Sequence, residues 1–139
     1  GGVMAFRYYT VSCAERAESQ LMAARSACLL SEAWRGQKAD ASFDPTQQDF
    51  ESYFQIEKML TPGLLGVAPS GSWSEKLDGT AGLTVLGNYR IRVDDKEFLA
   101  RLLYGADTVP NLRTIHILVV WSDHRGTRYE YYLPTFSQT

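Results

Sequence analysis

The chain has 139 residues, of which 45% are hydrophobic and 22% are charged, and its formal net charge is −2. This composition excludes a disordered protein and predicts one soluble globular domain with a substantial apolar core. The 14 basic residues are fewer than the 16 acidic ones, and no two of them are adjacent, so we expect no nucleic-acid partner. No run of about 18 apolar residues occurs, so no membrane-spanning helix is predicted within the chain.

Residues 3–35 are predicted to form one N-terminal helix, with Gly36 as the residue that ends it. At about 1.5 Å per residue this helix would be roughly 50 Å long, which exceeds the width of a domain of this size. Part of the helix must therefore project from its own domain. Gly1-Gly2 resembles a remnant of cloning, and Val3 begins an apolar run without a capping residue. We therefore expect that an upstream segment is missing.

Helical spacing arranges the side chains of this helix in two lines. The first line is Phe6, Cys13, Ala17, Leu21, Ala24 and Cys28, widened by Ala27 and Trp34, and the second is Met4, Tyr8, Val11, Met22, Leu29 and Ala33. Residues 12–20 are polar, whereas residues 21–34 are apolar around most of the circumference. We therefore expect the second half to lie on the domain and the first half to lead away from it.

The two cysteines, Cys13 and Cys28, are expected in this same helix. Fifteen positions of helix separate them by roughly 22 Å, and a disulfide needs Cα atoms about 4.4 to 6.8 Å apart. The two cysteines therefore cannot pair with each other within the helix. We expect small, buried or half-buried residues at both positions, with a bridge between chains as the alternative.

The middle of the chain, residues 37–74, has no sustained hydrophobic period and holds three of the five prolines. This pattern predicts a loop-rich region. Within it, Asp44 and Pro45 are suited to be the N-cap and first residue of a short helix over residues 46–58, which would bury Phe50 and Phe54.

The C-terminal half changes to a strand pattern, in which Tyr89, Ile91 and Val93 alternate with Arg90 and Arg92. Asp94-Asp95 and residues 122–126 have the composition of turns, and Gly126 can supply a positive φ. Two hairpins are therefore predicted, with four antiparallel strands at residues 89–93, 97–104, 114–121 and 127–133, the first lengthened by residues 83–86. A helix over residues 96–103 is the rival assignment, because its leucines also fit a helical period.

The segments Phe6-Arg7-Tyr8-Tyr9, Ala23-Ala24-Arg25 and Leu30-Ser31-Glu32-Ala33-Trp34-Arg35, together with the ending Ile115–Ser122 and Gly126, resemble the type IV pilin and pseudopilin family. The order of the predicted elements resembles that family as well. The resemblance implies an α+β fold in which a long N-terminal helix packs on a C-terminal antiparallel sheet of about four strands. A single domain is expected over residues 3–139, with a helix at 3–35, a loop-rich region at 36–82 and a sheet at 83–134.

By this resemblance the protein is a non-enzymatic structural subunit, a prepilin-type minor pilin or pseudopilin of a type IV pilus or a type II secretion pseudopilus. Its expected partners are other pilin or pseudopilin subunits, and the inner membrane through the missing N-terminal segment. Its expected location is the periplasm, anchored to that membrane, or the cell exterior in a filament. The implied assembly interface is the first half of the helix, with Met4, Phe6, Tyr8, Val11, Cys13 and Ala17.

Other groups of residues suggest alternatives. Tyr129 and Tyr131 share one strand face and, with Tyr89 or Trp121, could bind a glycan or another small molecule in the periplasm. Ordinary cross-strand packing explains the same residues. Hydrolytic chemistry would need Ser122, Asp123, His124 and His116. We expect the first three to form a solvated turn and His116 to lie on the surface of the sheet.

No cofactor or metal site is predicted. The glycine-bearing segments 63–66 and 79–82 lack the residues of a phosphate loop and are typical of turns. Asp94, Asp95, Asp107 and Asp123 are scattered, and calcium takes about six to eight oxygen ligands. We therefore expect these acids to mark turns.

Overall fold

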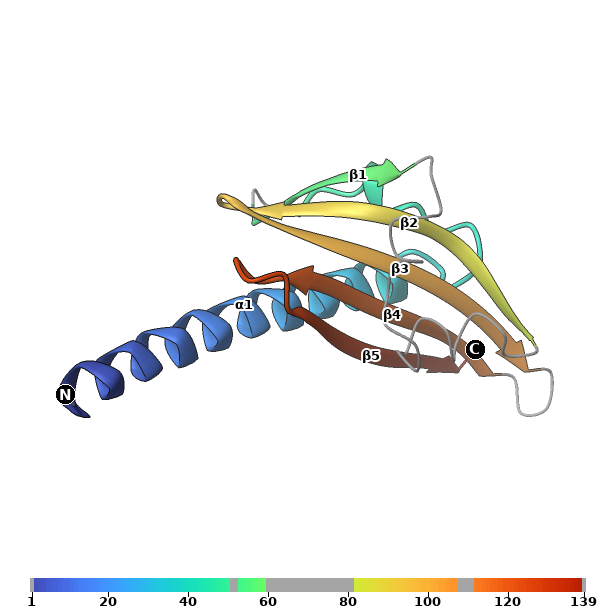
Figure 1. Ribbon diagram of the computed structural model, residues 1–139. Helices are drawn as coiled ribbons and strands as arrows, with labels where there is room; N and C mark the ends of the chain where they lie inside the picture. The colour runs from blue at the N-terminus through green and yellow to red at the C-terminus, as the bar shows by residue number, and fades with distance from the viewer. Residues whose placement is uncertain (1, 51–52, 60–81, 108–111, 139) are drawn as a thin grey trace.

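The computed structural model of the chain describes the backbone of residues 2–50, 53–59, 82–107 and 112–138, and the side chains of the same residues except 2–16 and 107. The helix α1 (Gly2–Gly36) precedes a 3-10 helix, η1 (Pro45–Gln47). Five strands form one antiparallel sheet in the order β1-β2-β3-β4-β5 (Figure 1). They are β1 (Gln55–Met59), β2 (Leu83–Val93), β3 (Lys96–Asp107), β4 (Leu112–Ser122) and β5 (Arg128–Gln138).

The expected fold class, a long helix packed on about four strands, is wrong. The molecule is mostly an antiparallel sheet of five strands, and the helix residues whose burial the structure describes, 17–36, include those that pack on it. The additional strand is β1, which pairs with β2 from Gln55 opposite Arg92 to Met59 opposite Asn88. It lies where a helix over residues 46–58 was expected.

The start of that expected helix is present, but the helix is a single turn. The Asp44 carboxylate accepts a hydrogen bond from the Thr46 amide at 3.0 Å, as an N-cap does. After this turn the chain extends, and the Phe50 and Phe54 rings stack with their centroids 4.4 Å apart. Both rings are buried. Pairing with β2 therefore overrides the helical spacing of the two phenylalanines.

Strands β2 to β5 lie at the four expected positions. β2 spans the lengthened first strand, β3 and β4 extend further at both ends, and β5 begins one residue later than expected, at Arg128, and continues to Gln138. The turn between β2 and β3 falls at Asp94, which has a φ of 54°. The rival helix over residues 96–103 is wrong, because Phe98, Ala100 and Leu102 alternate along β3 and are buried on one face of the sheet. The glycine-bearing segment 63–66 lies outside the described residues, and so do residues 79–81 of the second such segment, 79–82.

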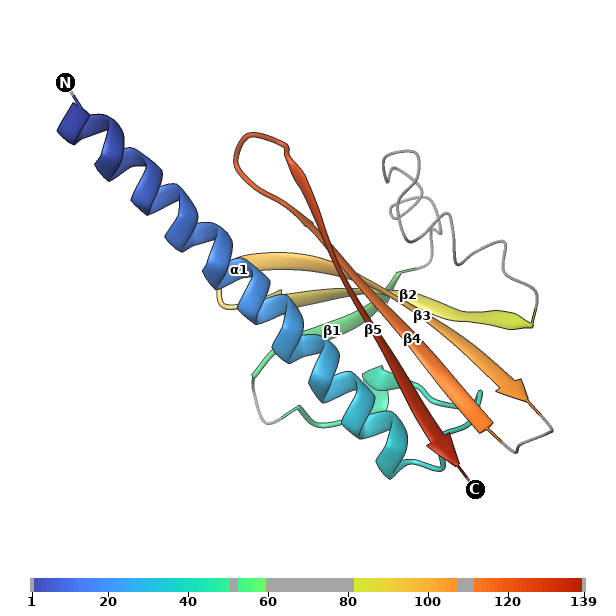
Figure 2. The ribbon, with the colours of Figure 1, turned by 90° about the horizontal axis from the view of Figure 1, so that it is seen from below.

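The helix α1 covers β4 and β5, on one face of the sheet (Figure 2). Its fully buried side chains are Ala23, Ser26, Ala27, Leu30 and Trp34. Three of these are small, so the helix axis can approach the sheet closely, and the Ser26 hydroxyl is satisfied by the Met22 carbonyl at 2.8 Å. Leu30 and Trp34 then pack among the buried aliphatic residues of β4. This contact is the centre of the hydrophobic core.

The C-terminal end of α1 is tied to the sheet by hydrogen bonds from two arginines. Arg35 Nη2 donates to the Phe136 carbonyl at 3.3 Å, and Arg113 Nη1 donates to the Lys38 carbonyl at 2.8 Å. Gly36 was expected to end the helix, but it is still helical, and the left-handed conformation falls at Lys38 and Ala39, with φ of 106° and 53°. The last turn is therefore held in place by these contacts with the sheet.

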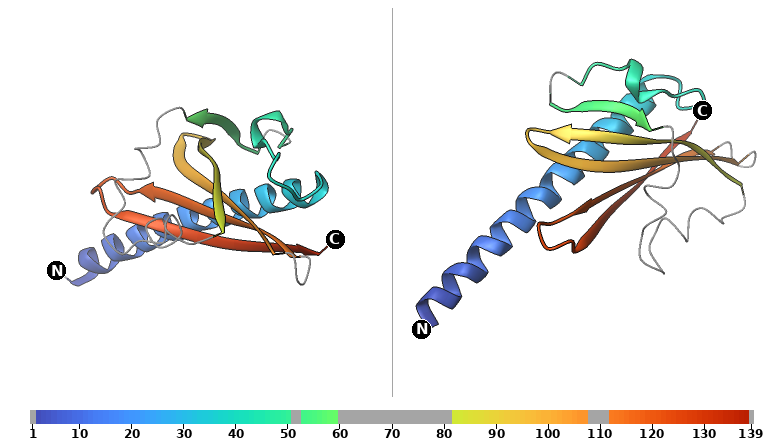
Figure 3. Two further views of the ribbon diagram at one scale, coloured as in Figure 1. Left: turned by 90° about the vertical axis from the view of Figure 1, so that its right-hand side faces the viewer. Right: turned by 45° about the horizontal axis from the view of Figure 1, so that its top comes forward.

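The N-terminal turns of α1 extend past the strands, so this part of the helix projects from the sheet (Figures 1 and 3). Among the helix residues whose side chains the structure describes, the first that is fully buried is Ala23. Among the described residues, no helix combines the length and the apolar character needed to cross a bilayer.

Deletion of residues 1–16 should lower the free energy of unfolding by less than about 1 kcal/mol, because the deleted turns lie before the buried face of α1. Truncation of the fully buried Leu30 to alanine should cost about 2 to 5 kcal/mol. Urea denaturation of both variants and of the intact chain measures the difference. A deletion that costs as much as Leu30→Ala would contradict this view of the projecting segment.

Candidate assembly surface

The face of α1 that points away from the sheet is apolar along one line. Ala17, Leu21 and Cys28 are exposed and Ala24 is half-buried. Their spacing of four, three and four residues places them on one side of the helix, and we call these four residues the outward line. Leu21 is the most exposed large hydrophobic side chain among the described residues, at 56%.

Leu21, Ala24 and Cys28 of the outward line lie within residues 21–34, which were expected to lie on the domain. That expectation is wrong for Leu21 and Cys28, and Cys28 is an exposed free thiol. The residues that the sheet does bury include Ala23 and Leu30, which were in neither predicted line. The sequence did contain a signal for this face. Ala23, Ala27, Leu30 and Trp34 are separated by four, three and four residues, which places them on one side of the helix, and this line ends at the large side chain of Trp34.

Most of the expected assembly residues lie on the projecting part of α1. Met4, Phe6, Tyr8, Val11 and Cys13 belong to the described helix backbone, and their side chains lie outside the described set. Ala17 is exposed and begins the outward line. The predicted interface and the observed apolar line therefore meet at Ala17.

Charged residues accompany the outward line with alternating sign. Glu18, Arg25 and Glu32 follow one another at intervals of seven residues, and all three are exposed. Seven residues correspond to nearly two turns of helix, so these three side chains lie on the same side. Glu18 Oε2 is also 3.6 Å from the Nζ atom of Lys96, the first residue of β3, so this part of α1 contacts the β2–β3 hairpin.

The turn between β4 and β5 contains the residues considered for hydrolysis. Asp123 Oδ1 accepts hydrogen bonds from the amides of Arg125 and Thr127, both at 2.9 Å, and Oδ2 accepts one from the Tyr129 hydroxyl at 3.2 Å. Burial alone would raise the pKa of Asp123, but these hydrogen bonds outweigh it and hold the pKa below its usual value. The carboxylate therefore stabilises the turn, where Gly126 has the expected positive φ of 81°.

His116 is not brought to this turn. It lies six residues before Ser122 in β4, about 20 Å away along an extended strand. Its Nδ1 is 2.5 Å from the Tyr132 hydroxyl, and the two rings are nearly parallel, with an interplanar angle of 4°. Burial raises the pKa of Tyr132, so the tyrosine keeps its proton. In the tautomer that carries its proton on Nε2, a neutral imidazole accepts a hydrogen bond from the Tyr132 hydroxyl at Nδ1.

Loss of stability between pH 7.5 and pH 5.5 is expected from His116. Burial lowers the pKa of His116 below its usual value of 6.5, so the unfolded chain takes up the proton first as the pH falls. The stabilising effect is therefore complete about one pH unit above 6.5, and it is lost as the pH falls through 6.5 toward the lowered pKa of the folded state. Replacement of His116 by glutamine should reduce this slope in urea unfolding, whereas His124→Gln should keep it. The same slope in His116→Gln as in the native chain would contradict this assignment.

The tyrosines considered for ligand binding are packed within the protein. The rings of Trp121 and Tyr129 stack on each other with centroids 5.8 Å apart, and Trp121 also contacts Phe98 at 5.7 Å. Tyr89 is buried, and Tyr131 is partly buried against the core cluster. Trp121 and Tyr129 are thus stacked as cross-strand packing predicts, and Tyr129 and Tyr131 are half-buried.

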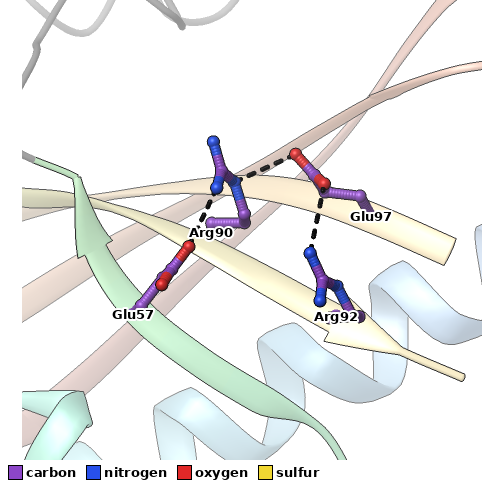
Figure 4. A network of polar contacts seen from close by, with 4 residues as sticks. All are labelled: Glu57, Arg90, Arg92 and Glu97. Atoms are coloured by element: carbon purple, nitrogen blue, oxygen red, sulfur yellow. Dashed lines mark hydrogen bonds and ion pairs between the residues drawn. The ribbon is translucent and has the colours of Figure 1, made fainter. Parts of the chain in front are cut away.

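Four charged side chains join the first three strands on the opposite face of the sheet (Figure 4). Arg90 contacts Glu57 at 2.9 Å and Glu97 at 3.0 Å, and Arg92 lies 3.9 Å from Glu97. A shallow depression beside them is lined by Gln55, Ile56, Glu57, Arg90 and Arg92. The two cations are balanced by two anions, so this network attaches β1 to the sheet without creating a site of net charge.

Metal ligands do not cluster in the part of the chain that the structure describes, where no three histidine, cysteine or acidic side chains come together. No protein-family model, no curated protein and no solved structure matches the chain.

Proposed function

We propose that this protein is a structural subunit that assembles through its N-terminal helix, as a minor pilin or pseudopilin does in a type IV pilus or a type II secretion pseudopilus. One observation carries the proposal. The same helix is buried on one side by its own sheet and carries an exposed apolar line on the other, while its N-terminal turns project beyond the strands. Such a helix can bury its outward line only against another molecule.

The composition of the outward line suits contact between helices. Three of its four residues, Ala17, Ala24 and Cys28, are small, so the axes of two packed helices can approach to about 8 Å. Leu21, which is 56% exposed, can then become buried in the contact. Complete burial of a leucine side chain stabilises by about 1.5 to 3 kcal/mol. Repetition of this contact along a filament would multiply its effect.

The charges beside the outward line favour one arrangement of neighbouring helices. Two parallel helices in the same register would set Arg25 against Arg25. A displacement by seven residues, about 10 Å along the axis, sets Arg25 against Glu32 of the neighbour instead. The same displacement sets Leu21 beside Cys28 and Ala17 beside Ala24. We propose this staggered, parallel packing for the assembled protein.

The partners in this proposal are other pilin-like or pseudopilin-like subunits and the inner membrane. The proposed location is the periplasm, attached to that membrane, or the cell exterior within a filament. The proposal requires no catalysis, no cofactor and no nucleic acid.

Disulfide trapping tests the staggered packing. In a Cys13→Ser background, Leu21→Cys should form disulfide-linked dimers with Cys28 of a neighbouring chain on mild oxidation. Positions 21 and 28 of one helix are about 10 Å apart, too far for a bridge within the chain. Peptide mapping by mass spectrometry should therefore identify a link between position 21 of one chain and position 28 of another.

The matched control is Val85→Cys in the same background, because Val85 is also an exposed apolar residue, at 41%, but lies in β2. Its cross-linking should be much slower. Equal rates for the two variants, or links only between identical positions, would contradict the proposed packing.

A further inference from the structure

Three cationic side chains gather at the C-terminal end of α1, and we call them the basic end. Arg35 lies in the last turn of the helix, Lys38 in the loop that follows, and Arg113 near the start of β4. Arg35 and Lys38 are exposed, and Arg113 is half-buried. Within the described part of the chain, none of the three forms an ion pair with a carboxylate. Their charges are therefore available to another molecule.

The two arginines of the basic end are already held in place. Arg35 donates a hydrogen bond to the Phe136 carbonyl, and Arg113 donates one to the Lys38 carbonyl. A carbonyl does not cancel the charge of a guanidinium, and each guanidinium keeps further N–H donors. Both groups are thus positioned before any partner binds, which reduces the entropy lost on binding.

One carboxylate, that of Asp40, lies near the basic end. Its Oδ1 accepts hydrogen bonds from the hydroxyl and the amide of Ser42. These hydrogen bonds, and to a smaller extent the charges of Lys38 and Arg113, hold the pKa of Asp40 below its usual value. Three cations and one carboxylate leave this end of the domain with a net positive charge.

Lys38 has a backbone conformation that favours glycine, with a φ of 106°. A glycine would adopt this conformation with less strain, so the lysine side chain does not serve the local fold. Strained positions of this kind are found where a side chain is needed for a function. The exposed ammonium group is the part of Lys38 that can have such a function.

Two carboxylates lie at the opposite end of the domain, in the turn between β2 and β3. Asp94 and Asp95 connect the paired residues Val93 and Lys96, and both are exposed. Neither forms an ion pair or a side-chain hydrogen bond within the described part of the chain. Lys96 contacts Glu18, so this acidic turn lies beside residue 18 of α1 (Figure 2).

The basic end and the acidic turn cannot meet within one chain. Residues 18 and 35 of α1 are about 26 Å apart along the helix. The contacts of Glu18 with Lys96 and of Arg35 with β5 fix the sheet at both of these levels. An ion pair requires its charged atoms to be within about 4 Å. The two groups of opposite charge can therefore pair only between copies of the chain.

We infer that the basic end of one copy binds the acidic turn of another copy, with the two α1 helices parallel. This inference rests on the staggered assembly proposed above. Three steps of seven residues displace a copy by about 21 residues of helix, or roughly 31 Å. Residue 18 of one copy then lies level with residue 39 of the other, so the acidic turn is level with Lys38.

This contact joins two different surfaces, so it does not close into a dimer and can continue along a filament. Exposed ion pairs each contribute little to affinity. The outward line therefore supplies most of the affinity between copies, and the contact between the ends selects their spacing along the filament.

Zero-length cross-linking with a carbodiimide tests the contact, because this reagent joins an amine to a carboxylate that touches it. Cross-linked dimers of the native chain should contain amide links from Lys38 to Asp94 or Asp95, as identified by mass spectrometry of their peptides. The matched control is Lys58, which is also exposed but lies in β1, and its links to the acidic turn should be several-fold rarer. An increase in salt from about 0.1 M to about 1 M shortens the Debye length from about 10 Å to about 3 Å, and it should reduce the Lys38 links several-fold.

Substitutions of Lys38 separate the contact from the fold. Lys38→Gly removes the cation and relieves the strained φ, so the variant should be at least as stable as the native chain in urea. Its association, measured by sedimentation velocity, should be several-fold weaker. Lys38→Arg keeps the charge and should associate as the native chain does. In the double variant K38E/D95K the charges are exchanged, so it should associate more strongly than either single variant.

The outcomes distinguish this contact from the helix packing. Native dimers without links from Lys38 to the acidic turn would overturn the inference, as would equal yields from Lys38 and Lys58 or native-like association of Lys38→Gly. If the disulfide between positions 21 and 28 forms while the Lys38 links are absent, the contact between the ends fails and the helix packing stands. If the Lys38 links form without that disulfide, the contact between the ends stands and the staggered packing fails.

Discussion

The contact between one face of α1 and strands β4 and β5 is the constraint on which the rest of the structure depends. Ala23 and Ala27 allow the helix to approach, and Leu30 and Trp34 fill the space beyond them; all four are fully buried. Because this face is fixed against the sheet, the opposite face must carry the outward line into solvent. The direction of the projecting turns follows from the same contact.

The position of α1 also determines which parts of the sheet edge are available. Arg35, in the last turn of the helix, binds the Phe136 carbonyl and protects the end of β5. At the other edge, Arg90 and the carboxylates of Glu57 and Glu97 hold the short strand β1 in place. Helix packing and edge protection are thus linked.

The strands of the C-terminal half could be predicted from the sequence because their apolar residues alternate, as Tyr89, Ile91 and Val93 do. β1 could not, because only Ile56 and Met59 in it are even partly buried, which leaves no period of two. The buried face of α1 was not identified, although the spacing from Ala23 to Trp34 was a signal for it. Residues 21–34 are apolar around most of the helix, so the choice between Leu21 and Leu30 depends on where the sheet lies. Among the residues expected to form the assembly interface in the first half of the helix, Ala17 is the only one whose side chain the structure describes.

Accessibility of a nitroxide label placed singly at positions 21 to 34 of the monomeric chain tests the orientation of α1 most directly. The account predicts high accessibility to a water-soluble relaxation reagent at positions 21, 25, 28 and 32, and low accessibility at positions 23, 27, 30 and 34. Low accessibility at positions 21 and 28, with high accessibility at positions 23 and 30, would contradict it. In that case the outward line would face the sheet, and the assembly surface would have to lie elsewhere.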